Sequence, residues 1–140
     1  MDAPVLADTG PLVAFLDRND PGHAWACAQF QRFTAPVLTC EAVLSEAAHL
    51  TIHIDPGARR LIDLLRADGL RLAFDLNDHL EAVAALLAKY HDVPMSLADA
   101  CLVRMSELHD GARIFTIDSD FKLYRRHSRQ AIPLIYPAPR

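Results

Sequence analysis

Residues 5–16, with the sequence VLADTGPLVAFL, place an acid between a strand and a helix. The continuous apolar run at 5–7 is followed at once by a turn signal, which predicts a strand buried on both faces, as in a parallel sheet. Thr9 is expected to cap the next helix, and Pro11 suits its first turn. Asp8 then stands at a carboxyl strand end, where α/β sheets form ligand crevices. Capping of a turn explains an aspartate there equally well.

Strands and helices alternate along the rest of the chain. We expect further strands at 36–39, 70–74, 112–118 and 132–136. We expect further helices at 21–35, 40–50, 58–68, 78–90, 97–110 and 120–126. Asp20, Asn77 and Ser96 are predicted N-caps, and Gly69 is predicted to end a helix. Because parallel strands need crossover connections, the pattern predicts an α/β fold with a central parallel sheet between helices, as one domain over residues 1–140.

Composition limits the classes of protein that fit this chain. With 140 residues and 51% apolar content, it suffices for one sizeable core. No apolar run approaches the roughly 20 residues that span a bilayer, and the N-terminus lacks a basic leader, so we expect a cytoplasmic protein with no membrane partner. Three cysteines without a CxxC pair argue against a disulfide framework and a cysteine-built zinc site.

The charge is unevenly distributed. A net charge of −4 argues against a protein that coats nucleic acid, but the segment at 122–129 is basic and has no acid. Its positive side chains either contact phosphates of a nucleic acid or form a solvated face. The candidates for RNA contact are Lys122, Arg125, Arg126 and Arg129.

Four acids lie where predicted strands end or helices begin: Asp8, Glu46, Asp99 and Asp118. Asp99 is three residues after Ser96, which fits a capping box, and Asp118 also has Asp120 beside it as a helix cap. If the four instead converge in one crevice, they repel each other unless a cation neutralises them. Oxygen ligands favour Mg²⁺ or Mn²⁺, which promote hydrolysis of a phosphodiester. Thr9 and Thr116 flank two of the acids and are candidate supporting hydroxyls.

Four segments in order resemble the motif blocks of PIN-domain ribonucleases, and VapC-type toxins of toxin–antitoxin modules most of all. They are LADTGPLVAFLD, TCEAVLSEA, SLADACLVRMSE and IFTIDSDFKLYR. The resemblance implies a three-layer α/β/α sandwich and a Mg²⁺- or Mn²⁺-dependent cut in single-stranded RNA. It matches Asp8, Glu46, Asp99 and Asp118 to catalytic and metal-binding acids, and Thr9, Thr116 and Asp120 to supporting positions. It also implies a small antitoxin partner and a homodimer.

Several alternatives remain open. Glu41 competes with Glu46 as the acid of the second block, and the number of metal ions is open. A PIN fold that only binds RNA, or a housekeeping RNA-processing protein, fits the same residues. A receiver-like phosphoacceptor fits less well, because the acidic pair and the lysine that such domains carry are missing. Serine-hydrolase, P-loop and Rossmann motifs are absent.

Overall fold

A parallel sheet forms the centre of the molecule. The structure is a computed structural model that describes residues 3–139. Within these residues, five strands pair in the order β3-β2-β1-β4-β7, and every pairing is parallel. The strands are β1 (Val5–Ala7), β2 (Val37–Thr39), β3 (Leu70–Leu72), β4 (Arg113–Phe115) and β7 (Leu134–Ile135). The predicted α/β class with a central parallel sheet is confirmed.

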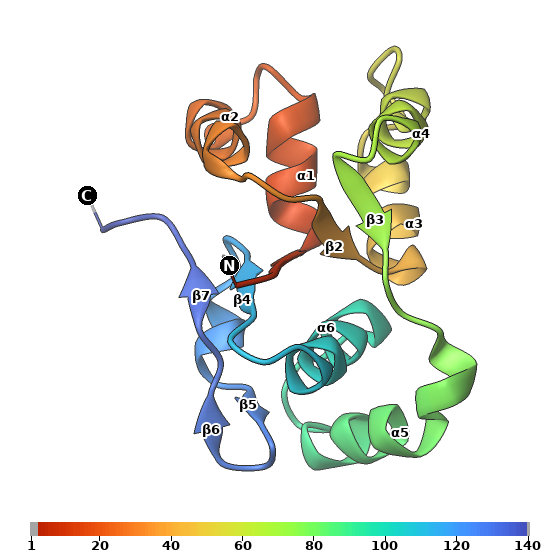
Figure 1. Ribbon diagram of the computed structural model, residues 1–140, viewed down its shortest axis with the longest axis vertical. Helices are drawn as coiled ribbons and strands as arrows, with labels where there is room; N and C mark the ends of the chain where they lie inside the picture. Colours follow the sequence, from red (N-terminus) through yellow and green to blue (C-terminus); the bar gives the residue numbers. More distant parts are fainter. Residues whose placement is uncertain (1–2, 140) are drawn as a thin grey trace.

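Helices cover both faces of the sheet (Figure 1). Helices α1 (Thr9–Leu16) and α2 (His23–Arg32) lie on one side, and α5 (Leu80–Lys89) and α6 (Leu97–Leu108) lie on the other. Helices α3 (Glu41–Leu50) and α4 (Ala58–Arg66) pack near the β3 end. The three layers of the expected sandwich are therefore present.

Within residues 3–139, none of the helices combines the length and the apolar character that a membrane span needs.

The hydrophobic core explains why these segments pack as they do. All three residues of β1 are buried, as expected for a strand in the middle of a covered sheet. Phe115 on β4 is fully buried, and its ring centroid lies 5.2 Å from that of Trp25 and 5.4 Å from those of Phe30 and Phe33. This aromatic cluster joins α2 to the centre of the sheet. The single tryptophan is half-buried and packs against the core.

The register between β1 and β4 fixes where the chain leaves the sheet. Leu6 pairs with Ile114 and Ala7 with Phe115, and the backbone N–H of Asp8 donates to the Phe115 carbonyl at 2.9 Å. The next residues along the two strands are Asp8 and Thr116. Because the strands are parallel neighbours, these two side chains meet at the carboxyl edge of the sheet.

Two predicted helix starts are wrong by one or two residues. Asp8, not Thr9, is the N-cap of α1, and its carboxylate accepts a hydrogen bond from the Thr9 N–H. Pro21 lies outside α2, which begins at His23 and ends at Arg32, before the expected end at residue 35. Asp20 instead accepts from the Gly22 N–H at 2.8 Å, which closes a turn ahead of the helix. Aspartates favour such turns as strongly as they favour caps, so the two uses look alike in sequence.

The segment around α5 also differs from the expectation. Asp75, not Asn77, caps this region, because its carboxylate accepts from the Asn77 N–H at 3.0 Å and starts the 3-10 helix η1 (Leu76–His79). Gly69 does not end α4, which stops at Arg66, and Asp68 carries the positive φ of 60°. The predicted cap at Ser96 is confirmed.

The basic segment is not the predicted helix at 120–126. A 3-10 helix, η2 (Ser119–Lys122), is followed by a hairpin of β5 (Arg125–Arg126) and β6 (Gln130–Ala131). His127 and Ser128 make the turn with φ of 46° and 68°, a conformation that side chains other than glycine seldom adopt. The sequence contains no glycine to signal this turn, so the hairpin could not be predicted from turn chemistry.

Candidate active site

Asp8 is buried at the junction of β1 and α1. Its side chain accepts hydrogen bonds from the Thr9 N–H at 2.8 Å and from the Thr116 hydroxyl at 2.7 Å. The Thr116 oxygen in turn accepts from the N–H of Asp118 at 2.9 Å. Thr116 therefore connects the two acids that follow β1 and β4, and its supporting role in catalysis stays a prediction.

The loop after β4 lies close against the start of α1. A Cβ atom at Gly10 would stand 2.6 Å from Cγ1 of Ile117, so only glycine allows this approach without a shift of the isoleucine. Residues 116–118, which were expected to extend the strand, turn here instead. Asp118 becomes the N-cap of η2, and its carboxylate accepts from the Asp120 N–H at 2.9 Å. The close packing holds Asp118 near Asp8.

Asp99 enters from the opposite helix layer. It forms the predicted capping box of α6: the Ser96 N–H donates to Asp99 Oδ2 at 3.1 Å, and the Asp99 N–H donates to the Ser96 hydroxyl at 3.0 Å. The buried hydroxyl of Tyr124 donates to the same Oδ2 at 3.3 Å. The capping function thus uses one carboxylate oxygen. The sequence interpretation missed Tyr124, although it lies within the fourth motif block.

The three aspartates affect one another electrostatically. Burial raises the pKa of Asp8 to about 6, hydrogen bonds from Thr116 and Thr9 oppose the rise, and the charges of Asp99 and Asp118 add to it. The pKa of Asp99 is also raised, first by burial and then by Asp118. Burial and the neighbouring charge of Asp99 raise the pKa of the Tyr124 hydroxyl. Asp8, Asp99 and Asp118 therefore form one cluster of negative charge, here called the aspartate cluster.

The two glutamates of the second block lie differently. Glu46 is exposed on α3, and the neighbouring charges that raise the Asp8 pKa are those of Asp99 and Asp118. Its assignment as the fourth acid stays a prediction. Glu41, the first residue of α3, is exposed and lines a pocket described below.

Two supporting positions have distinct surroundings. The Thr9 hydroxyl is buried beside Asp8 and has no hydrogen-bond partner within residues 3–139. Asp120 is half-buried, and its backbone N–H donates to Asp118. Its charge also acts on Tyr124, which places it at the margin of the aspartate cluster.

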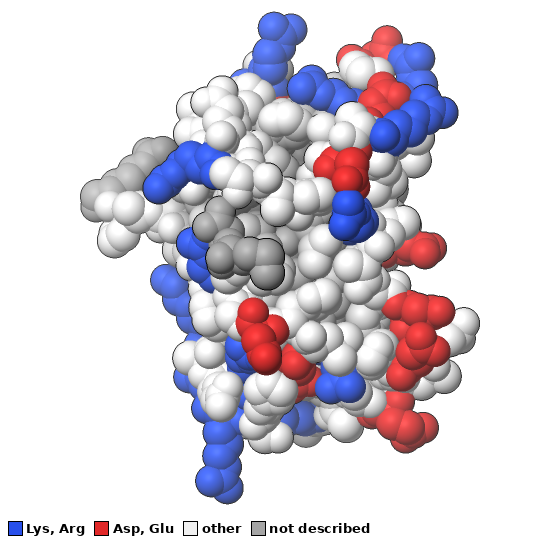
Figure 2. Space-filling view, in the orientation of Figure 1, with Lys and Arg blue, Asp and Glu red and all other residues white. Residues whose placement is uncertain are grey.

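The side chains predicted to contact RNA differ in their exposure and in the contacts that they already make. Arg126 is only 8% exposed, and its Nε has no hydrogen-bond partner within the part of the chain that the structure describes. Arg125 donates to the carbonyls of Lys122 and Tyr124. Lys122 lies over the Tyr136 ring at 4.1 Å, and Arg129 is exposed. Figure 2 shows basic side chains along the edge that carries the hairpin, opposite the acidic side chains gathered over η1 and α5.

Comparisons with known proteins agree with this geometry at the level of the fold. A solved structure with TM-score 0.75 is the crystal structure of Mycobacterium tuberculosis VapC20, described as a sarcin-ricin loop cleaving toxin; it is 19% identical in sequence. The match covers 85% of this chain and 93% of that one. The chain has the PIN fold. No family model and no curated protein matches the sequence.

The aspartate cluster of this PIN fold has the donor chemistry for a hard divalent cation. Its three side chains offer carboxylate oxygens as ligands, the charge of Asp118 raises the pKa of both Asp8 and Asp99, and the unpartnered Thr9 hydroxyl adds a further oxygen. Within residues 3–139, however, no three His, Cys, Asp or Glu side chains already stand close enough to hold a metal ion. Cation binding by these carboxylates is part of the function proposed below.

A pH dependence of stability follows from the Asp8 carboxyl. Its pKa in the folded chain, about 6, lies above the ordinary value of 3.8, so the folded state holds a proton that the unfolded state releases. This contribution to stability is fully present below pH 3.8 and is lost as the pH rises to about 6. In EDTA, we expect the difference in free energy of unfolding between wild type and Asp8→Asn to change by about 2 kcal/mol between pH 4 and 7.5, in favour of the variant at high pH.

Urea unfolding of both proteins at several pH values measures that difference. The subtraction removes the titration of acids elsewhere in the chain. A difference that stays constant from pH 4 to 7.5 would show that burial does not raise the pKa of Asp8.

Proposed function

We propose that this chain is a metal-dependent endoribonuclease that hydrolyses phosphodiester bonds of single-stranded RNA, as the toxin of a VapBC-type pair. The observation that carries the proposal is the aspartate cluster, in which Asp8, Asp99 and Asp118 come from three separate elements to one edge of the sheet. The PIN fold shared with a toxin described as cleaving the sarcin-ricin loop supports it.

The residues of the chain account for how the cluster is held. Thr116 and the Thr9 N–H orient Asp8, while the Ser96 N–H and Tyr124 hold one oxygen of Asp99. Three carboxylates alone repel an RNA phosphate, so Mg²⁺ or Mn²⁺ held by Asp8, Asp99 and Asp118, with Glu46 as the fourth candidate ligand, makes the site attractive to it. A bound divalent cation also makes water a better nucleophile and stabilises charge on the phosphoryl group.

The basic side chains complete the proposal. The exposed Lys122 and Arg129, with Arg125, lie on the segment that follows Asp118, and in this proposal they contact the RNA backbone on one side of the cleaved bond. Arg126 contributes from a buried position. A small antitoxin that neutralises the nuclease and a homodimeric assembly are parts of the same proposal, as is a place in the cytoplasm.

Cleavage of a mixed single-stranded RNA pool by the purified protein tests the function. With Mg²⁺ or Mn²⁺ we expect discrete products, and with EDTA we expect none, because the repulsion within the cluster is then unrelieved. A duplex of the same sequences should be cut more slowly. Absence of cleavage under every condition would contradict the proposal and favour a PIN fold that only binds RNA. Growth arrest on expression, relieved by the product of a short neighbouring gene, would identify the toxin role.

A further inference from the structure

A pocket lies beside the aspartate cluster, at the same edge of the sheet. Its volume is about 690 Å³. Three parts of the chain line it: the start of α3, the segment from β3 into η1, and the first turns of α6 (Figure 1). The residues used in the following argument are Cys40, Glu41, Ser45, Phe74, Asn77 and Cys101. A pocket of this size is large enough for a small organic group such as a nucleobase.

The topology places this pocket next to the aspartate cluster. Cys40 follows β2 and Phe74 follows β3, just as Asp8 follows β1. Neighbouring strands are spaced by about 5 Å, so the ends of β2 and β3 lie roughly 5 and 10 Å from the end of β1. The charge of Asp8 acts on Cys40, and Cys101 on α6 lies two residues after Asp99, so both cysteines of the pocket lie close to the aspartate cluster. A chain of nucleotides held at the aspartates therefore passes the mouth of the pocket.

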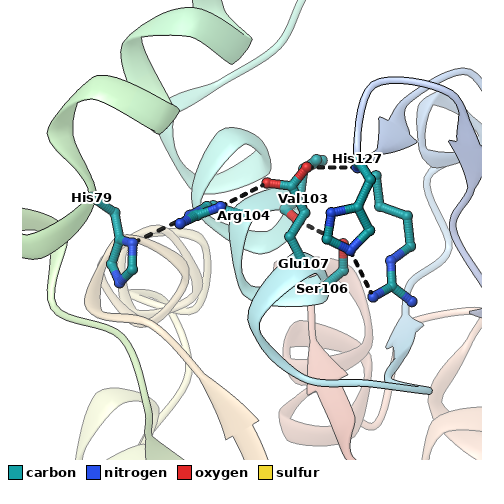
Figure 3. A network of polar contacts seen from close by, with 7 residues as sticks. His79, Val103, Arg104, Ser106, Glu107 and His127 are labelled. Carbon is teal, nitrogen blue, oxygen red and sulfur yellow. Dashed lines mark hydrogen bonds and ion pairs between the residues drawn. The ribbon is translucent and has the colours of Figure 1, made fainter.

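The aromatic residue that lines the pocket, Phe74, is held in place by its neighbours. Phe74 stacks on His79 with ring centroids 5.0 Å apart and an angle of 18° between the planes. The Nε–H of Arg104 on α6 donates to His79 Nδ1 at 3.2 Å, and Arg104 also pairs with Glu107 (Figure 3). This network ties η1 to α6, so the ring is held in place before any ligand arrives. A fixed aromatic surface is what unstacked RNA bases pack against.

The polar groups of the pocket favour a base over a phosphate. Glu41 brings an exposed carboxylate to it, and Ser45, one helical turn later, brings a hydroxyl. Asp75, which also lines the pocket, already accepts from the Asn77 N–H. The lining contains no lysine or arginine, so the pocket repels a phosphate. A carboxylate accepts two parallel hydrogen bonds best, and among RNA bases only guanine presents two adjacent donors, N1–H and N2–H₂, on its pairing edge.

We propose that this pocket binds a guanine base next to the cleaved phosphodiester, with Phe74 beside the base and Glu41 accepting from its N1 and N2 donors. The inference rests on the proposed function, because it assigns the pocket to the RNA substrate of that nuclease. Glu41 then determines base specificity and takes no part in the aspartate cluster. Of the two glutamates in the second motif block, Glu41 therefore binds the base, and Glu46 stays the candidate metal ligand.

Binding of free nucleosides in EDTA tests the pocket without any cleavage and without a phosphate for its carboxylates to repel. Guanosine should shift the backbone amide NMR signals of Glu41, Ser45 and Asn77, and it should bind at least about tenfold more tightly than adenosine, cytidine or uridine. Inosine, which lacks only the N2 amino group, should bind about tenfold more weakly than guanosine. Glu41→Gln should remove most of this preference, while Glu81→Gln, an equally exposed change on α5, should keep it.

The outcomes separate this inference from the proposed function. Equal binding of all five nucleosides, or a guanine preference that survives Glu41→Gln, would overturn the pocket assignment. If the protein cuts RNA with Mg²⁺ but guanosine shifts no pocket amide, the inference fails and the nuclease stands. If guanosine binds as expected but no RNA is ever cut, the pocket stands and the nuclease fails. When both hold, sequencing of the cleavage ends should show guanine at one fixed position, lost in Glu41→Gln.

Discussion

Asp8→Asn is expected to lower the rate of metal-dependent RNA cleavage by about a thousandfold or more, without loss of the fold. Removal of one correctly placed electrostatic group from an active site commonly has an effect of about 10²–10³, and Asp8 is the most buried acid of the cluster. The amide keeps the shape and still accepts from the Thr9 N–H, but it loses the charge and the acceptor that Thr116 uses. Single-turnover cleavage of one defined RNA measures the change.

The matched control for this variant is Asp92→Asn. Asp92 is exposed in the turn after α5, outside the aspartate cluster, and the change removes the same charge. We expect its cleavage rate to equal that of wild type, with unchanged circular dichroism for both variants. An Asp8→Asn protein that cuts within about tenfold of wild type would remove Asp8 from the chemistry and with it the proposed site.

Phe115→Ala is expected to reduce the free energy of unfolding by about 3–5 kcal/mol. The ring is fully buried on β4 and touches the aromatic side chains of α2, so its removal leaves a cavity that the neighbouring strands cannot close. Since small domains are stable by only about 5–15 kcal/mol, this is a large share of the total. Urea unfolding at 25 °C gives the value directly.

Phe115→Leu serves as the comparison, because it keeps most of the apolar volume. We expect it to lose less than about half of what the alanine variant loses. If Phe115→Ala lost less than about 1 kcal/mol, the aromatic cluster would not be the packed centre that its geometry indicates. At temperatures where the alanine variant is folded, its aspartate cluster should still form, because the backbone pairing of β1 with β4 remains.

Local patterns made parts of this protein predictable. The capping box of Ser96 and Asp99 depends on residues three apart, and the alternation of apolar strands with helices fixes the class of fold. The resemblance of four segments to known motif blocks also led correctly to the PIN fold. In each case the information lies within a few neighbouring residues or in the order of four short segments.

Features that depend on distant residues were not predictable in the same way. Tyr124 reaches Asp99 across 25 positions, and Arg104 reaches His79 across 25, with no local pattern to indicate either contact. The turn at His127 and Ser128 has left-handed backbone without glycine, so the hairpin that it closes had no local signal, and residues 120–126 were expected to form a helix. Glu46 is exposed on α3, and neither helix periodicity nor motif spacing fixes where the end of its side chain lies relative to the aspartates.

The pairing of β1 with β4 also sets an order of events during synthesis. Asp8 leaves the ribosome 108 residues ahead of its partner Thr116. Until β4 has emerged and inserted beside β1, the nascent chain has only part of its sheet and cannot bring Asp118 to Asp8. Contacts so far apart in sequence form late and slowly. A partly made chain is therefore incomplete at this edge of the sheet, and any activity that depends on the aspartates begins only after β4 has joined β1.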